Sequence, residues 1–147
     1  MHVDKLAWAI GLLDGARRLA STAQTTSEIG MSFFLLLGFS VENALKAHLE
    51  KKGEPPGKWE RSHDLTDLFD KASARGLAPM DGVEAFVRAL SPYHKDFVFR
   101  YPEKAGTVDL FKPASSIDAT NELCAAVFQH FDPAEIQASA AAQGVKP

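Results

Sequence analysis

The feature that most constrains the fold is a continuous apolar segment, residues 31–41, which leads directly into a charged helical segment. Helix-forming residues run from Ser27, a suitable cap, to Gly53, which suits the position just after a helix. The first half of this expected helix is apolar on nearly every face, whereas residues 42–52 are amphipathic. A helix that is apolar all round must be covered on all sides. Two arrangements satisfy this requirement: its own domain wraps the helix, or one of its faces meets a second copy of the chain across a two-fold axis.

Shorter helical segments flank this central helix. Apolar residues recur at helical spacing over residues 4–24, 62–76, 81–92 and 115–131. We expect Ser62 or Asp64 to cap the third helix, Pro92 to break the fourth, and the fifth to start at Ser115 or Ser116. Between the fourth and fifth helices, residues 97–101 alternate in polarity, as do Val108 and Leu110, and this predicts a short hairpin or a structured loop. The pattern predicts an all-α, up-and-down helical bundle of about five helices.

The C-terminal residues form a separate short segment. Asp132 and Pro133 are suited to begin an alanine-rich helix, after which the tail should fray. We therefore divide the chain into a helical domain over residues 1–131 and a C-terminal part over residues 132–147.

Composition narrows the class of protein. The net charge of −3 argues against binding nucleic acid by bulk charge, although a local basic pocket is compatible with it. A single cysteine, Cys124, excludes an intrachain disulfide and suits a reducing compartment. The apolar segment is far shorter than the roughly 20 residues of a membrane span, and no signal-peptide pattern opens the chain. We expect a cytoplasmic protein without a membrane anchor.

Three segments together resemble the HEPN family of helical domains. They are residues 40–49 leading to Gly53, residues 62–65 (Ser-His-Asp-Leu) followed by Leu68, and residues 100–102 (Arg-Tyr-Pro). Their order and spacing match the family's plan over roughly residues 5–131. The resemblance implies a bundle of four or five helices that commonly dimerises. Many HEPN domains are metal-independent endoribonucleases. Others bind nucleotides without catalysis, pair with a minimal nucleotidyltransferase, or act as scaffolds in toxin–antitoxin and defence systems.

The resemblance also suggests a catalytic pair. Ribonuclease members of the family carry an Arg and a His with four to six residues between them; here Arg88 and His94 have five residues between them. Arg88 would hold the scissile phosphate through its planar fork, and His94 would move a proton during attack by the RNA 2′-hydroxyl. The break expected at Pro92 would turn His94 back toward Arg88. The sequence departs from the family pattern in one respect, because Tyr93 precedes the histidine instead of following it.

Other residues are candidates for binding nucleic acid or a nucleotide. Lys95 and Arg100 contribute to a locally basic region, and Tyr101 could stack on a base. Arg100 could instead form a structural pair with the carboxylate of Glu42 while Tyr101 packs, and this is the interpretation we favour. Glu42 also stands four residues before Lys46, the spacing of a helical ion pair.

A metal site is not indicated by spacing. His63 and Asp64 could join His94 and Asp96 around an ion, but the chain has no helical His-x-x-x-His pair or similar strong pattern. We therefore predict neither a metal nor another cofactor.

Two functions remain open from the sequence. One is a homodimeric HEPN-like domain that engages RNA or a nucleotide, with metal-independent endoribonuclease activity. The other is a non-catalytic binding or scaffold module that pairs with a nucleotidyltransferase-like antitoxin. The directions of the Arg88 and His94 side chains distinguish the two functions. Side chains that line one groove favour the enzyme, and side chains that point apart favour the binding module.

Overall fold

The computed structural model describes residues 2–22, 26–96 and 112–144, and within them the chain is helical with no strand. The elements are α1 (His2–Thr22), α2 (Thr26–Lys51), the 3₁₀ helix η1 (Lys58–Arg61), α3 (Leu65–Ala74), α4 (Asp81–Lys95), α5 (Pro113–Phe128) and α6 (Pro133–Ala142). The predicted all-helical bundle is confirmed. The predicted loop or hairpin over residues 97–110 lies outside the described residues, as do Arg100 and Tyr101.

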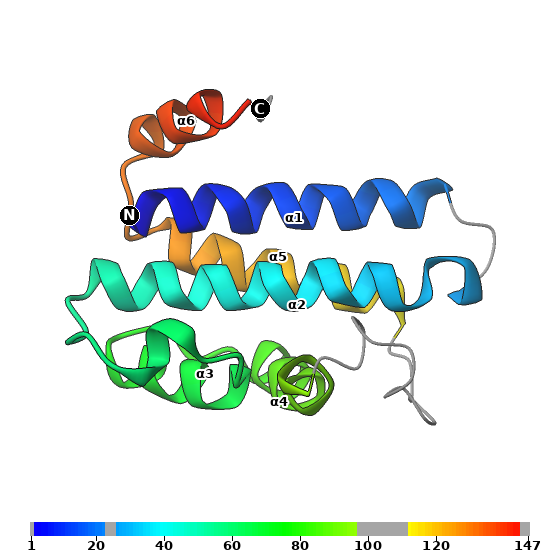
Figure 1. Cartoon of the computed structure of the whole chain (residues 1–147), viewed down its shortest axis with the longest axis horizontal. Coiled ribbons are helices and arrows are strands. Elements are labelled where there is room, and N and C mark those ends of the chain that lie inside the picture. The colour runs from blue at the N-terminus through cyan, green and yellow to red at the C-terminus, as the bar shows by residue number, and fades with distance from the viewer. Residues whose placement is uncertain (1, 23–25, 97–111, 145–147) are drawn as a thin grey trace.

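The long helix α2 is the centre of the bundle. It runs antiparallel to α1, and α5 lies behind these two helices (Figure 1). Helices α3 and α4 lie next to α2 on the side that faces away from α1. It contacts α1, α3, α4 and α5, whereas α6 packs against α1. Figure 1 shows α4 nearly end-on while α1 and α2 lie in the plane of the picture, so α4 crosses the bundle instead of continuing a simple up-and-down order.

The apolar half of α2 is largely covered by its own chain. Phe33, Phe34 and Leu37 are fully buried, and the rings of the two phenylalanines meet edge to face with centroids 5.0 Å apart. Leu36 and Phe39 are only half-buried. Of the two arrangements expected for this segment, wrapping by the domain therefore accounts for most of it and leaves one strip at the surface.

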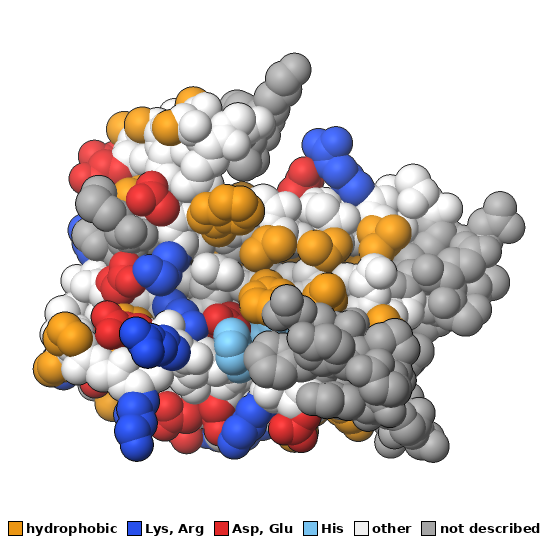
Figure 2. Space-filling view, viewed as in Figure 1, with side chains coloured by type: hydrophobic (Ala, Val, Ile, Leu, Met, Phe, Trp, Pro, Cys, Tyr) orange, Lys and Arg blue, Asp and Glu red, His pale blue; other side chains and the backbone are white. Residues whose placement is uncertain are grey.

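That strip forms part of an apolar face that α1 and α2 share. We define the α1–α2 face as Trp8, Leu12, Leu19, Leu35, Leu36 and Phe39. Trp8 is the most prominent of these residues, because 56% of it is exposed. Figure 2 shows apolar side chains gathered over these two helices, with histidine surface beside them. Of the described helices, none has the length and apolar character needed to cross a membrane.

The helix ends follow the expected signals closely. Asp64 caps α3 by accepting a hydrogen bond from the backbone N–H of Asp67 (3.2 Å), and Asp132 caps α6 in the same way through Ala134 (2.9 Å). Gly76, just after α3, adopts a positive φ of 90°, which only glycine takes without strain. The predicted short C-terminal helix is thus confirmed, and buried Ile136 ties it to the core.

Besides the predicted cap Ser27, which lies inside α2 because this helix begins at Thr26, two predicted boundaries were wrong. Helix α4 does not break at Pro92 but continues to Lys95, because the buried side chains of Ser91 and His94 hold its last turn against the bundle despite the hydrogen bond that proline removes. Helix α5 begins at Pro113, earlier than the serines we predicted, since proline is well tolerated in the first turn of a helix. The first correction matters for the candidate site, because an unbroken α4 sets the directions of Arg88 and His94.

Candidate functional site

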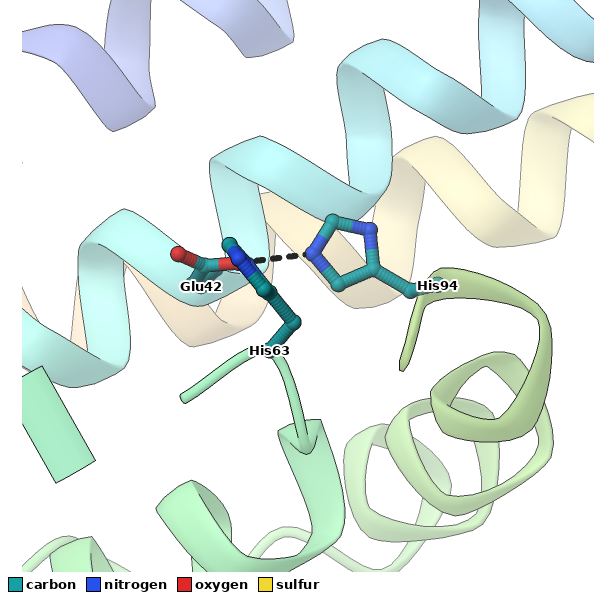
Figure 3. A group of neighbouring side chains, drawn as sticks. All are labelled: Glu42, His63 and His94. Carbon is teal, nitrogen blue, oxygen red and sulfur yellow. Dashed lines mark hydrogen bonds and ion pairs between the residues drawn. The ribbon is translucent and has the colours of Figure 1, made fainter. Parts of the chain in front are cut away.

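The clearest chemical feature of the described residues is a polar cluster between α2 and α4. We call it the Glu42 cluster and define it as Glu42, Lys46, His63 and His94. Nε2 of His94 lies 2.7 Å from Oε2 of Glu42, and Nδ1 of His63 lies 2.9 Å from the same oxygen. Figure 3 shows the two imidazole rings converging on this carboxylate. The ammonium of Lys46 donates to the other carboxylate oxygen, Oε1, at 2.7 Å.

Three separate parts of the chain supply these side chains. Glu42 and Lys46 lie one helical turn apart in the amphipathic half of α2, which aligns them on one face. His63 comes from the short connection between η1 and α3, directly before the cap residue Asp64. His94 lies in the last turn of α4.

The cluster is buried on one side and open on the other. Glu42, Lys46 and His94 are 5%, 5% and 2% exposed, whereas the His63 side chain is 36% exposed. An ionised carboxylate this deep requires partners for its lone pairs, and the four-residue arrangement supplies them. Solvent therefore reaches the cluster by way of His63.

The hydrogen bonds to Glu42 determine that its carboxyl group is ionised. Burial by itself would raise the pKa of the Glu42 carboxyl. The hydrogen bonds from its three neighbours, His94 first, outweigh this effect and lower the pKa from 4.5 to about 2. Glu42 is therefore ionised at neutral pH. Because a carboxylate only accepts hydrogen bonds, Nδ1 of His63 and Nε2 of His94 both carry the hydrogen.

The absence of a side chain at Gly38 makes room for His94. A Cβ atom at Gly38 would lie only 2.4 Å from Nδ1 of His94 and 3.1 Å from its Cγ. The neighbouring Phe39 ring meets the imidazole edge to face, with centroids 4.8 Å apart. The imidazole is thus held between the backbone of α2 and this phenylalanine, and its Nε2 is directed at Glu42.

Beside the cluster, Asp64 organises a second polar group. Its carboxylate accepts hydrogen bonds from Ser91 Oγ (3.2 Å) and Lys95 Nζ (2.9 Å) in addition to the backbone N–H that it caps. The bond from Lys95 is the main cause that lowers the pKa of the Asp64 carboxyl. Lys95 remains 57% exposed, so its charge is presented at the surface even though it is paired.

The predicted catalytic pair points in two directions. On an unbroken helix, residues six positions apart are separated by about 120° around the axis. Arg88 accordingly reaches α3, where its guanidinium donates to Asp70 (2.6 Å), and it also donates to Glu84 of its own helix (2.8 Å). These bonds raise the pKa of Arg88 further. His94 turns instead into α2, so the structure brings it together with Glu42 and not with Arg88.

The predicted partners of Glu42 are found in part. The pair with Lys46 is confirmed, and it is buried instead of being a weak surface contact. The predicted pair with Arg100 lies outside the described residues. Sequence reasoning placed His63 beside helix 3 without connecting it to Glu42. The available signal was its position directly before a helix cap, where the chain is held against the neighbouring helix.

Cys124 and His48 are both buried. Burial raises the pKa of the Cys124 thiol to about 11, which disfavours the reactive thiolate.

We found no family model, no curated protein and no solved structure that matches this chain.

Proposed function

We propose that this chain is a HEPN-like domain that engages RNA or a nucleotide and cleaves RNA without a metal ion, using the Glu42 cluster. The observation that carries the proposal is the ionised carboxylate shared by two histidines, one of which reaches the surface. A carboxylate that holds Nδ1–H of an imidazole fixes its tautomer and stabilises its charged form. This is the arrangement that proton transfer requires.

Within this proposal, His63 meets the substrate and His94 positions the carboxylate. His94 is only 2% exposed, so a bound RNA would not reach its ring. Since Glu42 holds Nδ1 of His63, the proton would move through Nε2. His63 takes the proton from a 2′-hydroxyl, which attacks the adjacent phosphorus as the bond to the 5′-oxygen breaks. The leaving 5′-oxygen is then protonated from solvent or by the same imidazolium.

We assign phosphate binding to the cationic side chains near the exposed side of His63. Lys95 presents its ammonium beside Asp64, next to His63. Arg100 and Tyr101 stay predicted contacts for phosphate and base. Arg88 could bind phosphate only if its hydrogen bonds to Asp70 and Glu84 were broken. We therefore assign Arg88 a structural role in the packing of α4 against α3.

Cleavage is tested with the purified full chain and with single-stranded and structured RNA in excess chelator. We expect cleavage that survives chelation, and a rate about 10²- to 10⁴-fold lower in His63→Ala, the range typical of general acid–base catalysis. His130→Ala is the matched control, because His130 is also partly exposed but packs beside His48 and does not belong to the Glu42 cluster. Absence of cleavage on every RNA, or equal rates in the two variants, would count against an enzyme.

A homodimer is expected with the first function, and the alternative function is a non-catalytic module that binds a partner protein. The exposed Trp8 and the rest of the α1–α2 face favour it, because large apolar residues gathered at a surface mark interaction sites. A nucleotidyltransferase-like antitoxin is the partner that the HEPN resemblance suggests.

The dimer is tested by measuring solution mass at micromolar concentration. We expect the wild-type chain to have twice the mass of one chain and Trp8→Glu to be monomeric, because a charge in the centre of an apolar interface is desolvated without a partner. Ala125→Glu, at an exposed position on α5, serves as the control and should stay dimeric. A monomeric wild type would contradict self-association.

A further inference from the structure

We propose that Glu42, His63 and His94 also form a binding site for a divalent transition-metal ion of the zinc type. Their ligand atoms, Oε2 of Glu42, Nδ1 of His63 and Nε2 of His94, all lie within 4.8 Å of one another. Two imidazole nitrogens and one carboxylate oxygen are a ligand set that zinc and neighbouring first-row ions prefer, and three protein ligands leave a fourth position for water. The proposal differs from the sequence prediction, which excluded a metal because no two ligands have the spacing of neighbours on one helix.

The distances suit an ion after a small adjustment. Zinc lies about 2.0–2.2 Å from nitrogen and oxygen ligands, so the ligand atoms of a tetrahedral site should be roughly 3.3–3.6 Å apart. The separations of 2.7 and 2.9 Å from Oε2 of Glu42 are hydrogen-bond lengths. Each must widen by roughly 0.4–0.9 Å to accommodate the ion. His63 can move this far because it lies between helices and its side chain is one-third exposed. Figure 3 shows the three groups facing one centre.

The surroundings hold the ligands in place. Lys46 occupies Oε1 of Glu42, which leaves Oε2 to bind an ion, and such outer contacts orient metal ligands. Gly38 and Phe39 enclose the ring of His94 so that Nε2 points at the same centre. The ammonium of Lys46 also repels a cation, which lowers affinity. Lys46→Met should therefore bind Zn²⁺ more tightly than the wild type, although the variant without metal is less stable.

An ion and proton transfer would exclude each other at this site. Metal binding takes the place of the hydrogens that His63 and His94 now share with Glu42. With Nδ1 of His63 bound to the ion, Glu42 no longer supports this imidazole in moving a proton. This consequence rests on the proposed function: Zn²⁺ would inhibit RNA cleavage, and chelation would restore it.

The binding test uses the full chain freed of metal, titrated with Zn²⁺ in competition with a chromophoric chelator. We expect one tight site per chain, weakened about 100-fold or more in His63→Ala, since even outer-shell changes cost 10- to 100-fold. His130→Gln, which alters a histidine outside the cluster, should bind as the wild type does. Co²⁺ should give the visible absorption of a four-coordinate ion in the wild type and lose it in His63→Ala. Saturating Zn²⁺ should raise Tm by roughly 5–10 °C.

Each result decides the inference. No Zn²⁺ binding at 100 µM, or equal affinity in His63→Ala and the wild type, overturns it. His63→Ala is preferred to His94→Ala because its position between helices leaves the core intact, and circular dichroism verifies its fold. Binding is measured without RNA, so a metal site without any cleavage would leave this inference standing and overturn the proposed function. RNA cleavage in chelator by a chain that does not bind Zn²⁺ would support the proposed function and overturn this inference.

Discussion

Glu42→Gln is expected to lower the free energy of unfolding at pH 7 by about 3–5 kcal/mol, the cost of removing one partner from a buried ion pair. The reason is that Lys46, only 5% exposed, would keep its charge without a carboxylate to balance it. The two histidines would also lose the oxygen that now accepts from both. Chemical denaturation at pH 7, followed by circular dichroism, measures the difference.

The effect of this substitution should depend on pH in a defined direction. The pKa of Glu42 is about 2 in the folded chain and 4.5 in its ordinary state, so the folded form favours the ionised group. Its contribution to stability is therefore complete above about pH 5 and is lost as the pH falls toward 2. The wild type and Glu42→Gln should converge in that window.

A double variant provides the control for charge. Glu42→Gln combined with Lys46→Met removes both members of the pair, and it should be more stable than Glu42→Gln alone. A difference below 1 kcal/mol between wild type and Glu42→Gln at pH 7 would show that the cluster is not a buried ionic network.

Gly38→Ala is expected to destabilise the chain by about 1–3 kcal/mol, although alanine is normally the better helix former by up to 1 kcal/mol. The added Cβ would lie 2.4 Å from Nδ1 of His94, so the imidazole must move away and lose its bond to Glu42. Thermal unfolding measures the loss of stability. The cleavage assay should show reduced activity in the same variant, because the carboxylate is no longer oriented.

Gly15→Ala is the matched control for helix propensity. Gly15 lies in the interior of α1, and a Cβ there would make only an ordinary contact with Leu36 at 3.8 Å. This variant should therefore be as stable as the wild type or slightly more stable. In a His94→Ala background, Gly38→Ala should no longer destabilise, since the atoms it meets are gone. A destabilisation of equal size in that background would refute the steric explanation.

Local pattern was sufficient for the helices and their ends. The 3.6-residue periodicity located α1, α3, α4 and α5, whereas helix-forming residues located α2 and the Asp132-Pro133 start located α6. Residue type identified the cap Asp132 and left Ser62 and Asp64 as alternatives for α3, because a cap acts on backbone N–H groups two or three residues away. The errors at Pro92 and Pro113 have one cause. Proline disfavours a helix interior and suits a first turn, and packing decides whether the helix continues past it, as α4 does at Pro92, or starts at it, as α5 does at Pro113.

The candidate site could not be assembled in the same way. Glu42 and His94 were both singled out in the sequence, but their bond spans 52 positions, and neither periodicity nor spacing carries such information. The expected partnership of Arg88 with His94 rested on proximity along the chain. An unbroken α4 instead separates their side chains around the helix axis, and carboxylates on both sides hold Arg88.

The sequence by itself determined which segments become helices, where most of them end, and that an apolar helix must lie at the centre. These properties depend on interactions within a few residues and on the burial that an apolar surface requires. Only the tertiary structure decided that two histidines from different segments share one carboxylate of that helix. The meeting depends on how α4 crosses α2 and on the space left by Gly38, and the packing of the whole bundle sets both.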